Sequence, residues 1–153
     1  MSAELSRERA QVAHVVAFEV ADPGQLEALA EAVVGTHAFC SADEASKVAA
    51  HESDNGVALI FFTDVQSPAE CALQVAKASQ LPIRTGIHSG LIQSQIDISG
   101  NEVLAGEGLS TARKMAALAA PGEIVVSQQC VGWLAEDPSF ASHLEQVGDR
   151  SLL

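Results

Sequence analysis

Hydrophobic residues in this chain fall into short blocks of strand length and into stripes with helical spacing. The segment 11–20 is rich in valine and carries a polar residue near its end, which is typical of a central strand. Other segments repeat leucine and alanine at helical intervals. The pattern predicts strands over 11–20, 47–52, 57–62, 81–88 and 124–126, and helices over 22–35, 67–79 and 106–119.

Turn and capping residues separate these segments. Asp22 caps a helix whose first residue is Pro23, and Ser67 opens the next helix in the same way. The Asn55-Gly56 pair lies between two apolar blocks and is a strong hairpin signal. The resulting order, β-α-β-β-α-β-α-β, predicts an α+β fold. We expect a ferredoxin-like β-α-β-β-α-β core with an additional helix and strand, and one helix layer on a largely antiparallel sheet.

The length of 153 residues fits one domain, which we place at 11–153 after an N-terminal extension over 1–10. No apolar run approaches the roughly 20 residues of a membrane helix. Eight basic and 20 acidic residues give a net charge of −12, which argues against nucleic acids and anionic membrane surfaces as partners. The widely spaced Cys40, Cys71 and Cys130 fit neither a disulfide framework nor a zinc site. We expect all three to be buried and reduced in a cytoplasmic protein.

Several segments, in order along the chain, resemble the class III nucleotidyl cyclase catalytic domain, also called the cyclase homology domain. They are the strand VAFEV at 16–20, the hairpin DNGVALIF at 54–61, RTGIHSG at 84–90, GEGLSTARKM at 106–115 and APGEIVVS at 120–127. The resemblance implies the ferredoxin-like core already expected from the pattern. It also implies a further terminal strand, so we expect the C-terminal strands to be truncated here.

The resemblance implies two acidic positions that hold two divalent metal ions in active members. These positions correspond to Glu19 and Asn55 in this sequence. Glutamate can still bind magnesium, although its longer side chain displaces the carboxylate, whereas asparagine offers only a neutral oxygen. We therefore expect a weak or absent metal site and no cofactor, with Mg²⁺ or Mn²⁺ required only if the domain retains activity.

The resemblance also implies an asparagine and an arginine four residues apart on a helix, where they stabilise the transition state. They correspond to Ser110 and Lys114, a shorter side chain and a cation without the planar guanidinium. Arg113 points about 100° away from Lys114 around the helix, so we do not expect it to substitute. The purine-selecting lysine and aspartate of adenylyl cyclases correspond to His51 and Val103, which lack that chemistry.

Two functional interpretations follow. In the first, the chain is a catalytically inactive cyclase homology domain, a regulatory or dimerisation module in cyclic-nucleotide-type signalling. It would pair with itself or with another cyclase homology domain, and ATP and GTP are its candidate ligands. The valine-rich strands and the apolar run at 57–62 exceed what one sheet face needs to bury, which predicts an exposed partner surface. The alternative is a weak or unusual cyclase that converts ATP or GTP to the cyclic nucleotide and pyrophosphate with a divalent metal.

The same residues also have ordinary structural interpretations. Glu19 can be a solvated carboxylate at a strand end, and Asn55 can serve only its turn. Ser110 and Lys114 can be surface residues of a helix. His88 is expected to be a structural, hydrogen-bonded histidine. We favour the inactive module because all six family positions depart from the catalytic pattern together.

Overall fold

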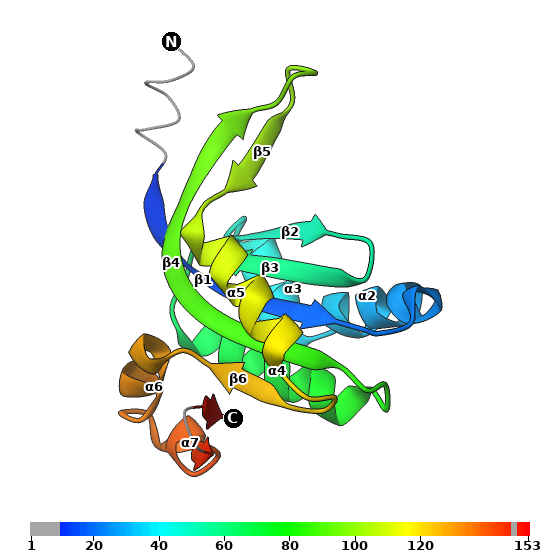
Figure 1. Ribbon diagram of the computed structural model, residues 1–153. Coiled ribbons are helices and arrows are strands. Elements are labelled where there is room, and N and C mark those ends of the chain that lie inside the picture. The colour runs from blue at the N-terminus through cyan, green and yellow to red at the C-terminus, as the bar shows by residue number, and fades with distance from the viewer. Residues whose placement is uncertain (1–9, 148–149) are drawn as a thin grey trace.

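The computed structural model describes residues 10–147 and 150–153, and within them the chain forms an eight-stranded sheet flanked by helices (Figure 1). The strands are β1 (Gln11–Glu19), β2 (Val48–Glu52), β3 (Gly56–Phe61), β4 (Arg84–Ile96), β5 (Glu102–Ala105), β6 (Ile124–Val126), β7 (Glu145–Val147) and β8 (Arg150–Leu152). The helices are the 3₁₀ turn η1 (Pro23–Gln25), α2 (Leu26–Val34), α3 (His37–Glu44), α4 (Gln66–Ala78), α5 (Glu107–Leu118), α6 (Gln128–Leu134) and α7 (Pro138–Ala141). The predicted extension over 1–10 lies outside the described residues apart from Ala10.

The strand order is β2-β3-β1-β4-β6-β8-β7, and β5 pairs with β4 alone. The first four strands in this order pair antiparallel throughout, which is the ferredoxin-like arrangement. β6 joins β4 in parallel, and β8 and β7 continue antiparallel. The predicted α+β fold with its ferredoxin-like core is confirmed.

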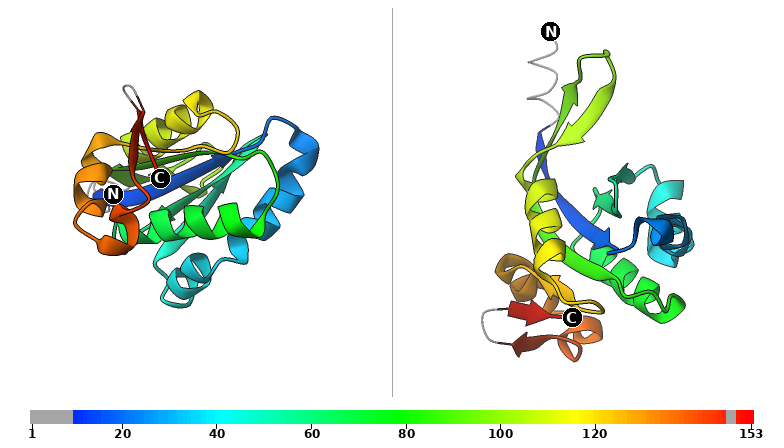
Figure 2. Two further views of the ribbon diagram at one scale, coloured as in Figure 1. Left: turned by 90° about the horizontal axis from the view of Figure 1, so that it is seen from below. Right: turned by 45° about the vertical axis from the view of Figure 1, so that its right-hand side comes forward.

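Helices cover both faces of the sheet, so the expected single helix layer is wrong (Figure 2). Along β1, Val16 and Phe18 join the core formed with α2 and α4, whereas Val15 and Ala17 join a second core with α5. Because both faces of the strand are buried, apolar residues are required at consecutive positions. This explains why apolar and polar residues do not alternate regularly along β1. Every residue of β3 is likewise buried. Residues 57–61 of the apolar run are therefore part of the two cores and provide no partner surface, and Phe62 packs half-buried against the second core.

The β2–β3 hairpin is confirmed, but its glycine has a different role from the predicted one. Gly56 is the first residue of β3 and lies opposite Glu19 of β1. Its backbone is not among those with positive φ in the described residues. A Cβ at this position would lie only 2.3 Å from the carbonyl oxygen of Phe18. Gly56 thus permits a close approach of two strands, and this approach places Asn55 beside the end of β1.

Helix capping is partly as predicted. Asp22 caps η1, its carboxylate accepting a hydrogen bond from the Gly24 NH at 2.9 Å. For α4, Asp64 takes the role expected of Ser67: the Asp64 carboxylate accepts hydrogen bonds from the Ser67 NH and hydroxyl, both at 3.0 Å. The helix therefore begins slightly earlier than the Ser-Pro pair predicts.

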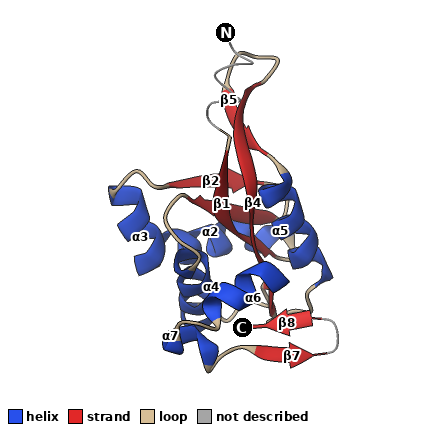
Figure 3. Cartoon of the chain, turned by 90° about the vertical axis from the view of Figure 1, so that its left-hand side faces the viewer, coloured by secondary structure: helices blue, strands red, loops and turns tan. Residues whose placement is uncertain are grey.

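Elements beyond the predicted set include α3, β5 and everything after β6. β4 continues to Ile96 and turns back as β5, so the two strands form an arm that projects from the body (Figure 3). Cys71 and Cys130 are buried as expected, whereas Cys40 on α3 is exposed because α3 lies on the surface. No helix in the described part of the chain is long and apolar enough to cross a membrane.

Candidate functional site

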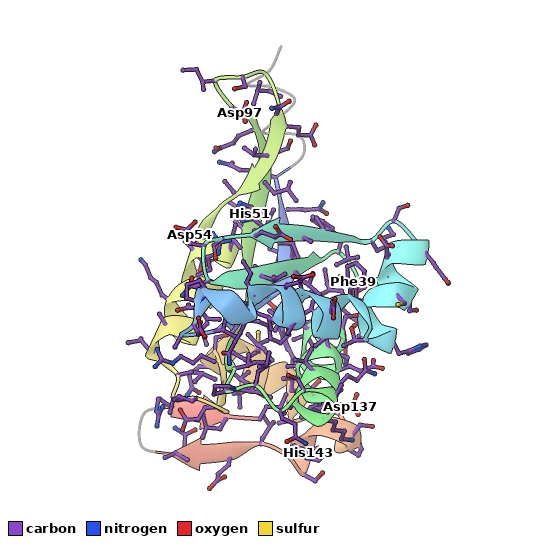
Figure 4. The ribbon with its side chains drawn as sticks, turned by 90° about the vertical axis from the view of Figure 1, so that its right-hand side faces the viewer. Phe39, His51, Asp54, Asp97, Asp137 and His143 are labelled. Carbon is purple, nitrogen blue, oxygen red and sulfur yellow. The ribbon has the colours of Figure 1, made fainter. Side chains whose placement is uncertain are left out.

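A cavity of about 200 Å³ lies where the end of β1, the β2–β3 turn and α5 meet. Its polar lining comes from Glu19, Ser53, Asn55 and Arg113, and the remaining lining residues are apolar. Figure 4 shows His51 on β2 and, in the turn that follows, the exposed Asp54. The cavity therefore gathers side chains from three segments that are distant in sequence.

Glu19 and Asn55, the two positions expected to hold metal ions, contact each other directly. The Asn55 side-chain amide donates a hydrogen bond to the Glu19 carboxylate at 3.1 Å. The backbone carbonyl oxygen of Asn55 accepts a hydrogen bond from the Val20 NH at 2.9 Å, which fixes the turn against the end of β1. Asn55 thus presents a donor to the carboxylate, whereas a second metal-binding carboxylate would present an acceptor.

Arg113 lines this cavity, although the sequence predicts no role for it in the site. It does point away from Lys114, as expected, and this direction turns it toward β2 and the end of β1. Its guanidinium donates a hydrogen bond to Nδ1 of His51, with the nitrogens 2.6 Å apart. A signal for this placement exists in the sequence, because Arg113 follows the buried Leu109 by four residues and so flanks the buried stripe of α5.

The pKa values of Arg113 and of its partner His51 are both shifted. Burial lowers the pKa of Arg113, and the nearby charge of Glu19 acts in the opposite direction. Burial also lowers the pKa of His51, and the positive charge of Arg113 lowers it further. A neutral His51 is consistent with its role as the acceptor of the Arg113 hydrogen bond.

The shifted histidines predict a pH-dependent stability. Burial lowers the pKa of both His51 and His14 below the ordinary value of 6.5. The unfolded chain therefore takes up protons on these groups from about pH 6.5 downward, while the native protein takes them up only at lower pH. The free energy of unfolding is therefore highest above about pH 6.5 and decreases as the pH falls from this value through the lower pKa values of the native protein.

We expect a lower free energy of unfolding at about pH 5.5 than at about pH 7.5, measured by urea denaturation. His51→Gln should reduce the difference between the two pH values, because it removes one of the groups that titrate. His143→Gln, at an exposed position, serves as the control and should retain the wild-type difference. An unchanged pH dependence in His51→Gln would contradict the assignment.

The other three family positions lie apart from the cavity lining. Ser110 and Lys114 are exposed on α5, and the Ser110 hydroxyl bonds back to the Glu107 carbonyl oxygen at 3.4 Å. Val103 lies on β5 in the arm and is 36% exposed. The structure therefore brings Glu19, Asn55 and His51 together around Arg113, and it leaves Ser110, Lys114 and Val103 on other surfaces.

The residues present do not fit a divalent metal site. A hard cation requires several oxygen ligands, commonly carboxylates. The cavity offers one carboxylate, which already accepts the Asn55 amide, and a guanidinium lines the same space. Within residues 10–147 and 150–153, no cluster of three histidine, cysteine, aspartate or glutamate side chains could hold a metal ion. The negative charge of Glu19 and the positive charge of Arg113 therefore balance within the lining.

The sequence matches no protein-family model and no curated protein. Its structure is nevertheless similar to solved cyclase domains. An adenylate/guanylate cyclase/hydrolase from Silicibacter pomeroyi superposes with a TM-score of 0.62 and 17% identity over 94% of both chains. The guanylate cyclase domain of RhGC from Catenaria anguillulae, in complex with GTP, gives 0.62 and 13% over 93% of both chains. A non-canonical dimeric guanylyl cyclase domain of the RhoGC fusion protein from the aquatic fungus Blastocladiella emersonii gives 0.58 and 14%, over 95% of this chain and 97% of that one.

At these identities the likeness concerns the fold. The chain has the fold of adenylate and guanylate cyclase catalytic domains over about 94% of its length, which confirms the resemblance noted in the sequence. What the domain does with this fold depends on the cavity residues described above.

Proposed function

We propose that this chain is a catalytically inactive cyclase homology domain that serves as a regulatory dimerisation module in cyclic-nucleotide-type signalling. The hydrogen bond between Asn55 and Glu19 carries the proposal, because it joins the two positions that correspond to the metal ligands of active cyclases. The proposal places the module in the cytoplasm, where Cys40, Cys71 and Cys130 would remain free thiols.

The substitutions at Ser110 and Lys114 support the same conclusion. Both side chains are exposed on α5, where a partner chain could meet them. A serine hydroxyl cannot reach as far as an asparagine amide, and a lysine ammonium cannot form the paired hydrogen bonds of a guanidinium. A second chain docked against α5 would therefore meet neither of the family's transition-state groups.

Retention of the whole fold supports a binding role. An exposed apolar surface, which we call the arm face, runs from the body into the arm and is made of Val12 on β1, Leu91 on β4 and Val103 on β5. Val12 lies opposite Leu91 in the β1–β4 register, and Val103 lies opposite Gln95, on the same side of β4 as Leu91. Val12 and Leu91 are 59% and 48% exposed. Val12 and Leu91 are direct cross-strand neighbours, and an exposed apolar pair of this kind supports a partner surface here.

The arm face continues toward α6. The Trp133 ring packs edge-on against His14, with the ring centroids 6.1 Å apart, and His14 follows Val12 on the same side of β1. Trp133 is itself partly exposed. A partly exposed tryptophan next to His14 fits a protein interface, and the non-canonical dimer of a guanylyl cyclase domain of similar fold is an example of pairing in this fold.

We expect a homodimer whose dissociation constant decreases as salt rises toward physiological ionic strength. Two copies each carrying a net charge of −12 repel one another, and salt screens this repulsion. Sedimentation equilibrium at low and at physiological salt measures the effect. A strict monomer in both buffers at about 100 µM, where a micromolar complex would be formed, would contradict self-association. Pairing with a different cyclase homology domain would then remain.

Matched variants locate the interface. Leu91→Asp should weaken the dimer at least about tenfold, because it would bury an unpaired charge in the arm face. Val34→Asp adds the same charge at a similarly exposed apolar position on α2, outside the arm, and should leave the dissociation constant near the wild-type value. Equal effects of the two substitutions would place the interface elsewhere.

A further inference from the structure

Arg113 stands out because it brings a positive charge to the place where the cyclase fold would be expected to hold metal ions. Arg113 lines the cavity together with Glu19 and Asn55. The hydrogen bond to His51 anchors it, so the side chain is held between β2 and its own helix. The side chain is only partly exposed, which limits how far water screens its charge.

We propose that Arg113 is a built-in counter-cation for Glu19, which takes the charge-compensating place of a divalent metal and keeps metal ions out of the cavity. This inference rests on the proposed function and gives it a specific chemistry. Glu19 receives a hydrogen bond from Asn55 and lies in the electrostatic field of Arg113. The carboxylate is thereby compensated by groups of this chain alone.

The charges in the cavity explain why a metal is excluded. Glu19 and Arg113 together contribute a net charge of zero to the lining, and Ser53 and Asn55 are neutral. A divalent cation would meet one carboxylate and one guanidinium within the same small volume. Repulsion between the cation and the guanidinium would offset attraction to the carboxylate. Removal of the guanidinium charge should therefore raise metal affinity, with Glu19 as the ligand.

Calorimetric titration with Mn²⁺ tests this inference on the intact chain. Wild type should show no saturable binding at millimolar Mn²⁺, which sets a lower limit for its dissociation constant. Arg113→Met should bind Mn²⁺ with a dissociation constant at least about tenfold below this limit. Lys114→Met removes the same charge from the adjacent exposed position and should remain like wild type. Arg113→Lys, which retains a positive charge in the cavity, should also remain like wild type. Glu19→Gln in the Arg113→Met background should abolish the gain.

Thermal unfolding with and without Mn²⁺ gives a second readout that needs only folded wild type and Glu19→Gln. If Arg113 excludes the metal, Mn²⁺ should shift the melting temperature of these two proteins equally. A larger rise in wild type than in Glu19→Gln would overturn the proposal, as would an Arg113→Met protein that folds without gaining Mn²⁺ affinity. Neither readout involves cyclase activity or oligomeric state, so failure here is distinguishable from failure of the proposed function.

Discussion

Gly86→Ala is expected to lower the free energy of unfolding by about 3 kcal/mol, because α5 packs directly on the backbone of β4 at this glycine. A Cβ at Gly86 would lie 2.4 Å from the Ala112 carbonyl oxygen and 2.6 Å from the Ala116 amide nitrogen. Both are backbone atoms of a helix and cannot move without displacing α5. The same close packing sets the position of Arg113, which follows Ala112 directly.

Urea denaturation of Gly86→Ala beside Gly132→Ala measures this effect. Nothing lies within 4 Å of a Cβ added at Gly132, which is within α6. The control should be neutral or more stable by up to about 1 kcal/mol, since alanine favours helix. A Gly86→Ala protein as stable as wild type would show that α5 and β4 do not need this close approach.

The order of the core elements could be predicted because it depends on local chemistry. Asp22 and Pro23 define the start of a helix. The valines of 11–20 identify a central strand regardless of which helices pack on it. The β2–β3 hairpin was predicted from Asn55-Gly56, although Gly56 serves the contact with Phe18 rather than a turn of positive φ. A local signal can therefore give the right element for a different physical reason.

Elements with little apolar content were not predictable from periodicity. The second half of β4 includes Gln93, Ser94 and Gln95, and it extends into the arm, away from the helix-covered part of the sheet. α3 has a clear cap, in which the Thr36 hydroxyl accepts a hydrogen bond from the Phe39 NH at 3.2 Å. That cap could have revealed the helix, but its apolar positions are few, and a cap alone does not define a helix.

The candidate site was predictable in part. The resemblance to the cyclase family selected Glu19 and Asn55, but the hydrogen bond between them depends on the register of β1 with β3. Arg113 was missed because a helix position beside the buried stripe can face solvent or a neighbouring strand. In this fold β2 supplies His51 at that point, and a helical wheel contains no information about β2.

The purified protein is expected to form neither cyclic AMP nor cyclic GMP. Each transition-state contact of the kind that Ser110 and Lys114 replace contributes about 10²-fold to the rate, so loss of both removes about 10⁴-fold. Loss of the metal ions would remove the charge stabilisation of the leaving pyrophosphate in addition. Arg113 balances the charge of Glu19, but it cannot replace the divalent metal ions that bind phosphate oxygens during cyclisation.

The most direct test is a cyclase assay of the full chain at about 100 µM, with ATP and with GTP in Mn²⁺, the more permissive metal. A heat-inactivated sample of the same preparation gives the background. An inactive cyclase homology domain predicts product no higher than this background for either nucleotide. Sustained formation of cyclic AMP or cyclic GMP above it, abolished by Glu19→Gln, would contradict the account.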